Sequence, residues 1–136
     1  MQFVTDNVWM IFIAVSSGLM LLWSFIGNRV RGIQEIECAD ALQLINHKHA
    51  LVLDVREEKE FNGGHILNAK LIPLGKLVER KAELERNREQ VIVVMCRSGQ
   101  RSASACVLLG KEGFKQVYNL SGGVLAWQKS GLPLEK

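Results

Sequence analysis

One cysteine in this sequence is surrounded by residues that would make it reactive. Cys96 opens the heptapeptide Cys-Arg-Ser-Gly-Gln-Arg-Ser and directly follows an apolar run, residues 91–95. This pattern is typical of a buried strand that turns into a helix. The amide N–H groups of such a turn, together with the positive end of the helix dipole, stabilise an anion. We therefore predict that Cys96 is a nucleophile whose pKa is lowered.

The loop after Cys96 is predicted to bind an anionic substrate. Arg97 and Arg101 add positive charge, since a guanidinium group does not deprotonate in proteins. Gly99 is expected to adopt a backbone angle that a side chain would forbid. The remaining polar residues are expected to shape the loop and cap the helix rather than to react; they are Ser98, Gln100 and Ser102.

The pattern of apolar residues predicts the elements that position this loop. Short apolar runs predict strands, and apolar residues at helical spacing predict helices between them. The run at 91–95 has no polar face, which indicates a central strand of a parallel sheet with helices on both faces. The expected strands are 51–55, 69–72, 91–95 and 117–120, and the expected helices are 39–45, 74–86, 102–111 and a last short one that carries Trp127.

Five motifs in order make residues 33–134 resemble the rhodanese-like sulfurtransferase domain. They are the cysteine loop, Leu53-Asp54-Val55-Arg56, Glu60-Phe61-Asn62-Gly63-Gly64-His65-Ile66, Ile72-Pro73-Leu74, and the stretch from Val117 to Trp127. The resemblance implies an α/β fold with a parallel five-stranded sheet flanked by helices. It also implies that Cys96 accepts a sulfane sulfur from a small anionic donor such as thiosulfate. The resulting persulfide would pass sulfur to a thiophilic acceptor, for example a protein thiol, without a cofactor.

Outside the loop, three residues are expected to support the site. Asp54 and Arg56 end a predicted strand, and with Glu60 and His65 they are expected to form a hydrogen-bonded and ionic brace near the loop. His65 is expected to be structural, because no nucleophile lies beside it in the sequence. Two further cysteines, Cys38 and Cys106, are expected to pack, and a role as a resolving thiol stays open for either.

Two other functions remain open from the sequence. The first is a membrane-bound recruiting module that has kept the fold and lost the chemistry. The second is a cysteine-dependent phosphatase of the related cell-cycle type, which also uses a cysteine in an anion-binding loop. Those phosphatases place the arginine six positions after the cysteine, whereas Arg101 follows Cys96 by five. The shorter loop resembles that of the sulfur-handling proteins.

The N-terminal part is predicted to be a separate membrane anchor, residues 1–28, ahead of a domain at 29–136. Residues 8–27 carry no charge and as a helix would match the hydrocarbon core of a bilayer. Arg29 and Arg31 follow this stretch, and only Asp6 precedes it. This bias predicts a single-pass protein of the inner (cytoplasmic) membrane with its C-terminal domain in the cytoplasm.

Composition narrows the remaining function classes. The formal net charge of the 136 residues is +3, with acidic and basic residues interleaved, so no nucleic-acid surface is expected. The three cysteines include no closely spaced pair, which argues against a zinc site or a disulfide scaffold. His47 and His49 are expected to lie in solvent past the end of a helix, so no metal is expected.

Overall fold

The computed structural model describes the backbone of residues 1–30 and 33–136, with side chains for all of these except residues 24–30. The chain divides into two compact units, Met1–Gly32 and Ile33–Lys136. All of the predicted site residues lie in the second unit.

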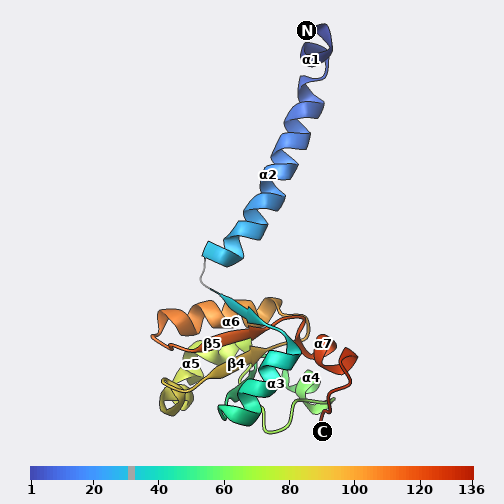
Figure 1. The fold of residues 1–136 in the computed structure, drawn as a ribbon. Coiled ribbons are helices and arrows are strands. Elements are labelled where there is room, and N and C mark those ends of the chain that lie inside the picture. The colour runs from blue at the N-terminus through green and yellow to red at the C-terminus, as the bar shows by residue number, and fades with distance from the viewer. Residues whose placement is uncertain (31–32) are drawn as a thin grey trace. The chain divides into compact units, whose positions relative to one another are not determined.

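A parallel sheet of five strands forms the centre of the second unit (Figure 1). The strands lie in the order β1-β5-β4-β2-β3, and every neighbouring pair is parallel. All four residues of the central strand β4 are buried, as its apolar run predicts. The predicted fold class, a five-stranded parallel sheet flanked by helices, is confirmed. The strand bounds are β1 Gln34–Ile36, β2 Leu51–Asp54, β3 Lys70–Leu71, β4 Ile92–Met95 and β5 Val117–Leu120.

The strand β1 is the one that the residue pattern does not predict. It is three residues long, two of them are exposed, and it pairs with β5 at the edge of the sheet. So short a strand shows no alternation to detect. The expectation of five strands came from the family resemblance alone.

Helices cover both faces of the sheet and form two cores. Ile92, Val94 and Cys96 point to one face, where the long helix α6 packs, and Val93 and Met95 point to the other, where α3 and α7 pack. This arrangement places Cys96 at the end of a strand that is covered on both sides. The helix bounds are α3 Cys38–His47, α4 Glu58–Asn62, α5 Leu77–Arg80, α6 Gln100–Lys111 and α7 Gly123–Lys129.

The helix predicted over 74–86 is wrong in type. This stretch forms a 3₁₀ turn η1 (Leu74–Lys76), the four-residue helix α5 and a second 3₁₀ segment η2 (Lys81–Asn87). Leu77 and Leu84 are both fully buried against α6 and the sheet. The predicted burial is therefore kept at Leu77 and Leu84 but not at Val78, which is exposed, and the segments on either side of α5 form hydrogen bonds of the tighter i→i+3 kind.

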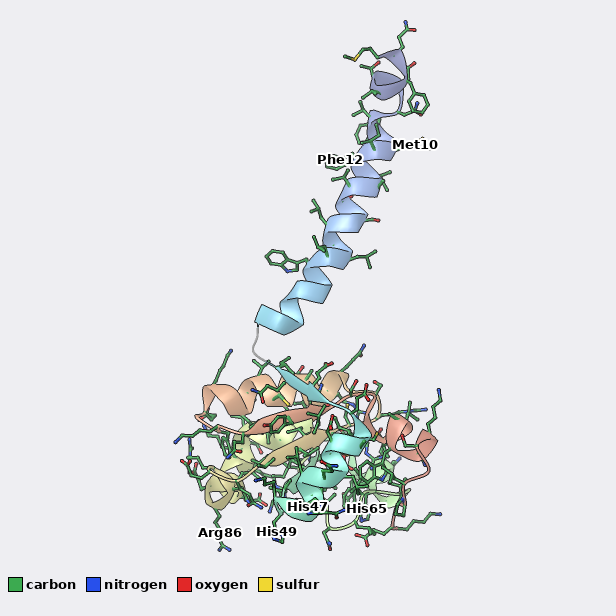
Figure 2. The ribbon with its side chains drawn as sticks, in the orientation of Figure 1. Met10, Phe12, His47, His49, His65 and Arg86 are labelled. Carbon is green, nitrogen blue, oxygen red and sulfur yellow. The ribbon has the colours of Figure 1, made fainter. Side chains whose placement is uncertain are left out.

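The first unit consists of α1 (Gln2–Asp6) and α2 (Val8–Val30). The apolar side chains of α2, such as Met10 and Phe12, extend outward and are exposed (Figure 2). Among the residues that the structure describes, no helix is both long and apolar enough to cross a membrane. The predicted span, residues 8–27, ends in positions whose side chains lie outside the described part, and the predicted anchor is not supported.

Candidate active site

The Cys96 loop lies at the carboxyl end of β4, where parallel sheets place their ligands. Cys96 follows the last residue of the strand, and α6 begins four residues later at Gln100. Gly99 makes the turn between them with a φ of 107°, a conformation that residues with a side chain rarely adopt. Gly99 therefore adopts a backbone angle of the kind that the sequence predicted.

The sulfur atom of Cys96 is buried and faces hydrogen-bond donors. The N–H of Gly99 donates to Sγ at 3.0 Å, and the hydroxyl oxygen of Ser102 lies 3.4 Å from Sγ. Burial raises the pKa of this thiol, whereas its contact with the Ser102 side chain and the amides of Ser102, Gly99 and Ser98 lower it. The lowering contributions are larger together, so the pKa of Cys96 lies below its ordinary value.

Asn119 on β5 completes this cluster, and sequence reasoning did not single it out. It is 1% exposed, and its amide nitrogen donates to the carbonyl of Gly99 at 3.1 Å. Its amide oxygen accepts a hydrogen bond from the Ser102 hydroxyl at 2.5 Å. A polar residue at an inward position of a buried strand was the available signal, since buried polar groups require partners.

The two loop arginines lie in different surroundings. Arg97 is exposed at the surface of the loop. Arg101 forms a two-pronged ion pair with Glu60 on α4, with N···O distances of 2.7 and 2.9 Å. This pair lowers the pKa of Glu60 to about 2 and raises that of Arg101. Because its charge is balanced by Glu60, Arg101 adds less positive charge to the loop than the sequence suggested. Ser98 and Gln100 are also exposed.

The start of α7 holds the loop from the other side. The N–H of Val124 donates to the carbonyl of Cys96 at 2.8 Å, and that of Leu125 donates to the carbonyl of Arg97 at 3.2 Å. This approach leaves no room for a side chain at Gly123. A Cβ there would lie 2.6 Å from the carbonyl oxygen of Arg97 and would also collide with that of Cys96. Gly123, the first residue of α7, therefore allows the close approach to the Cys96 loop, beyond making a turn.

The predicted supporting residues form separate contacts instead of one brace. The buried pair Asp54–Arg56 is joined by several hydrogen bonds, the shortest 2.7 Å, and Arg56 also donates to the carbonyl of Gly64 at 2.8 Å. His65 stacks on Phe61, with ring centroids 3.8 Å apart, and its Nε2 lies 3.2 Å from a carboxylate oxygen of Glu135. Asp54 and Arg56 thus fix the start of the segment that leads to α4, and His65 holds the C-terminal segment.

The other two cysteines lie in the packed core. Cys38 and Cys106 are both free and buried. Burial, with smaller contributions from the charges of Glu35 and Cys96, raises the pKa of Cys106 to about 12. At neutral pH this thiol stays protonated, as suits a packing residue.

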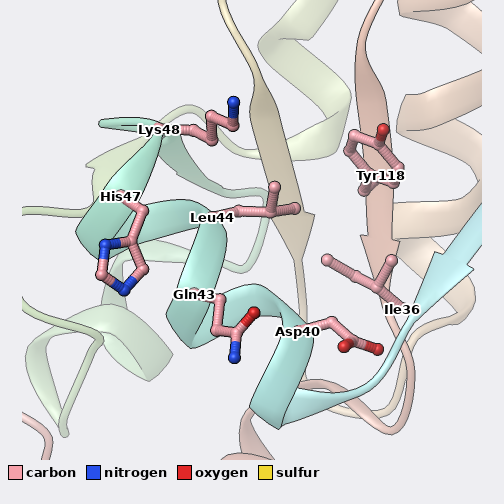
Figure 3. Close-up of a pocket in the computed structure, with 7 residues that line it drawn as sticks. All are labelled: Ile36, Asp40, Gln43, Leu44, His47, Lys48 and Tyr118. Atoms are coloured by element: carbon pink, nitrogen blue, oxygen red, sulfur yellow. The ribbon is translucent and has the colours of Figure 1, made fainter.

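A hollow of about 310 Å³ lies elsewhere, between α3 and the strands β1 and β5 (Figure 3). Leu44 of α3 faces Ile36 and Tyr118 across it, with polar groups of α3 at its rim. Ile36 and Leu44 belong to the core on the α3 side of the sheet, opposite the one that includes Cys96. Cys96 is therefore not part of this hollow.

Comparisons with known proteins show which family the chain resembles. The family model of the rhodanese-like domain matches residues 37–130. A protein of Allochromatium vinosum named sulfurtransferase is 35% identical over 103 residues, which are 75% of this chain and 94% of that protein. The uncharacterised protein YqhL of Bacillus subtilis is 41% identical over 81 residues, 60% of this chain and 63% of its own length.

A solved structure gives the same assignment. The crystal structure of a rhodanese-related protein from Thermoplasma volcanium superposes with a TM-score of 0.69 at 34% identity, and the match covers 75% of this chain and 97% of that one. With its parallel sheet, its cysteine loop at the end of β4 and these matches, the chain belongs to the rhodanese family.

Proposed function

We propose that this protein is a sulfurtransferase that carries a sulfane sulfur as a persulfide on Cys96. The observation that carries the proposal is the environment of Sγ, which is buried, faces amide donors and has a lowered pKa. A thiolate is the reactive form of a cysteine. The name of the Allochromatium vinosum relative supports the same class of reaction.

The reaction with thiosulfate would proceed by displacement at sulfur. The Cys96 thiolate attacks the outer sulfur of the donor, a bond forms between Sγ and that sulfur, and the S–S bond of thiosulfate breaks. Sulfite leaves with the electron pair. An acceptor such as cyanide or a protein thiolate then attacks the outer sulfur and releases the Cys96 thiolate.

The chain's own residues would assist both steps. The loop amides around Sγ stabilise the thiolate and, after loading, the charge on the outer sulfur. The exposed guanidinium of Arg97 is positioned at the surface of the loop to attract a dianionic donor and to balance the departing sulfite. Arg101 holds α4 against the loop through Glu60 rather than acting as an unpaired charge.

Intact mass spectrometry of the full chain tests the proposal. After incubation with thiosulfate and removal of the excess, the wild type should gain the mass of one sulfur atom, and Cys96→Ser should not. Cyanide should remove the sulfur and release thiocyanate. A reactive Cys96 that takes no sulfur would favour another donor or the phosphatase, which hydrolysis of an aryl phosphate would reveal. An unreactive Cys96 would favour the recruiting module.

The location of the protein is a second part of this proposal. We propose that residues 8–27 insert into the inner (cytoplasmic) membrane as a single pass, with the domain in the cytoplasm. The structure does not support the span, so this part rests on the uncharged sequence and on the exposed apolar side chains of α2. We expect the full chain to remain in the membrane fraction after a carbonate wash. The substitution Leu19→Asp should release it from that fraction. Labelling of Cys96 by an impermeant thiol reagent outside intact cells would contradict the orientation.

A further inference from the structure

In the resting site, the hydrogen bonds around Cys96 allow the Ser102 hydroxyl only one orientation. The amide nitrogen of Asn119 donates to the carbonyl of Gly99, so its amide oxygen is the atom that faces Ser102. An amide oxygen has no hydrogen to donate. The Ser102 hydroxyl must therefore be the donor in the 2.5 Å contact with Asn119.

This arrangement determines what Ser102 can offer to the sulfur. A serine hydroxyl has one hydrogen, and in the resting site that hydrogen points to Asn119. The side of the Ser102 oxygen that faces Sγ, 3.4 Å away, therefore carries lone pairs. A protonated Cys96 can donate to this oxygen, whereas a thiolate cannot.

Ionisation of the thiol therefore disturbs the network. If the Ser102 hydroxyl continues to donate to Asn119, the thiolate faces a lone pair of the Ser102 oxygen. If the hydroxyl rotates toward the thiolate, the amide oxygen of Asn119 loses its donor inside the protein, where Asn119 is 1% exposed. A buried polar atom without a partner is costly. A sulfur-loaded Cys96 avoids this conflict, because Sγ then has neither a hydrogen nor a full charge.

We propose that Asn119 is a positioning residue for Cys96: by accepting the hydrogen of Ser102, it prevents that hydroxyl from stabilising the Cys96 thiolate. The resting network therefore favours the thiol and the sulfur-loaded form over the bare thiolate. The loop amides of Ser102, Gly99 and Ser98 remain as the donors that stabilise the negative charge, and the lowered pKa of Cys96 then rests on them rather than on the Ser102 hydroxyl. This role rests on the proposed function in one respect only: Cys96 is the nucleophile of the proposed reaction.

Few other ionisable groups act on Cys96 among the described residues. From α6 the Arg101 guanidinium and the Cys106 thiol interact electrostatically with Cys96, and from α4 Glu60 balances the charge of Arg101. Among the described residues, the hydrogen bonds of the Asn119 side chain go to Ser102 and Gly99 and not to these three groups. Substitutions of Asn119 and Ser102 therefore leave these charges in place.

The test compares the pH dependence of Cys96 alkylation in four proteins. They are the wild type, Ser102→Ala, Asn119→Leu and the double variant, all as the full chain, with Cys96→Ser as the blank. Iodoacetamide labelling, measured by intact mass, gives the pH midpoint of each. In the wild-type background, Ser102→Ala should leave the midpoint unchanged or lower it. A hydroxyl that donated to the thiolate would instead make the midpoint rise by about one pH unit.

Without Asn119, the effect of Ser102→Ala on the pH midpoint should change sign. Asn119→Leu releases the Ser102 hydroxyl to donate to the thiolate, so the midpoint should fall by about one pH unit. In this background Ser102→Ala should raise it again. Asn119→Asp, which keeps an acceptor for Ser102, should not lower the midpoint. The sign of Ser102→Ala in the wild type decides the question even if Asn119→Leu does not fold.

Two results would overturn the proposal. One is a rise of the midpoint when Ser102→Ala is made in the wild type. The other is a fall of the midpoint on Asn119→Leu that is equally large in the wild-type and Ser102→Ala backgrounds, because Asn119 would then act on Cys96 without involving the Ser102 hydroxyl. Alkylation needs no sulfur donor, so failure of Cys96 to load from thiosulfate would count against the proposed function and leave this test unaffected.

Discussion

Cys96 and Cys106 belong to the same buried cluster beside α6, yet their thiols differ in acidity. They are 1% and 6% exposed. Burial raises the pKa in both, to about 12 for Cys106, while hydrogen-bond donors at the start of α6 bring that of Cys96 below its ordinary value. Burial alone makes an inert cysteine. The same burial combined with inward-facing amides makes a reactive one.

The most direct test of this comparison is the alkylation of the two thiols in one protein. At neutral pH, Cys96 should react at least about a thousand times faster than Cys106, because so little of a thiol with a pKa of about 12 is ionised. Peptide mapping after timed treatment with iodoacetamide measures the ratio. Similar rates would mean that the donors at the loop do not distinguish the two sites.

Substitution of Gly123 should remove the donors from their positions without touching Cys96. Gly123→Ala places a Cβ against the carbonyls of Cys96 and Arg97, at a φ of 57°. We expect the free energy of unfolding to fall by about 3 kcal/mol and alkylation of Cys96 at neutral pH to slow about tenfold. Urea unfolding and labelling rates measure the two effects.

Gly110→Ala is the matched control for that variant. Gly110 lies within α6, and a Cβ there would meet nothing within 4 Å. This substitution should stabilise the protein by about 0.5–1 kcal/mol, because alanine favours a helix over glycine. A loss of Cys96 reactivity in Gly110→Ala as large as in Gly123→Ala would show that the loop is sensitive to any change nearby.

The smallest effect is expected from the charges beside the loop. Glu60→Gln breaks the partly exposed pair with Arg101 and should cost about 0.5–1 kcal/mol of stability near neutral pH. Since the pKa of Glu60 is lowered from 4.5 to about 2, the pair stabilises the folded state fully above about pH 4.5 and loses its effect as the pH falls through 2. Urea unfolding of both proteins across this range measures it.

The same variant also sharpens the comparison of the two cysteines. If amides rather than charges set the acidity of Cys96, the pH midpoint of its alkylation should change by less than about half a pH unit in Glu60→Gln. A larger change would mean that the ion pair on α4 is a main contributor to thiolate stability, and that Cys106 differs from Cys96 chiefly in its distance from charge.

The sequence predicted the parts of this molecule that are local in the chain. The apolar run before Cys96 and the glycine after it indicate a strand, a turn and a helix, and the structure places them so. The pairing of Arg101 with Glu60 and of Ser102 with Asn119 joins residues 41 and 17 positions apart. Such contacts depend on which strands become neighbours, and the pattern of single residues does not specify this.

The close approach of Gly123 to the Cys96 loop also has a consequence for synthesis. The ribosome makes the cysteine loop before it makes β5 and α7, which supply Asn119 and the N–H groups that hold the loop. A nascent chain that ends before Val117 would therefore carry Cys96 in a loop that lacks these hydrogen bonds, in a sheet that still lacks its β5 strand. The hydrogen bonds that hold the Cys96 loop are complete only when the last strand and helix join the fold.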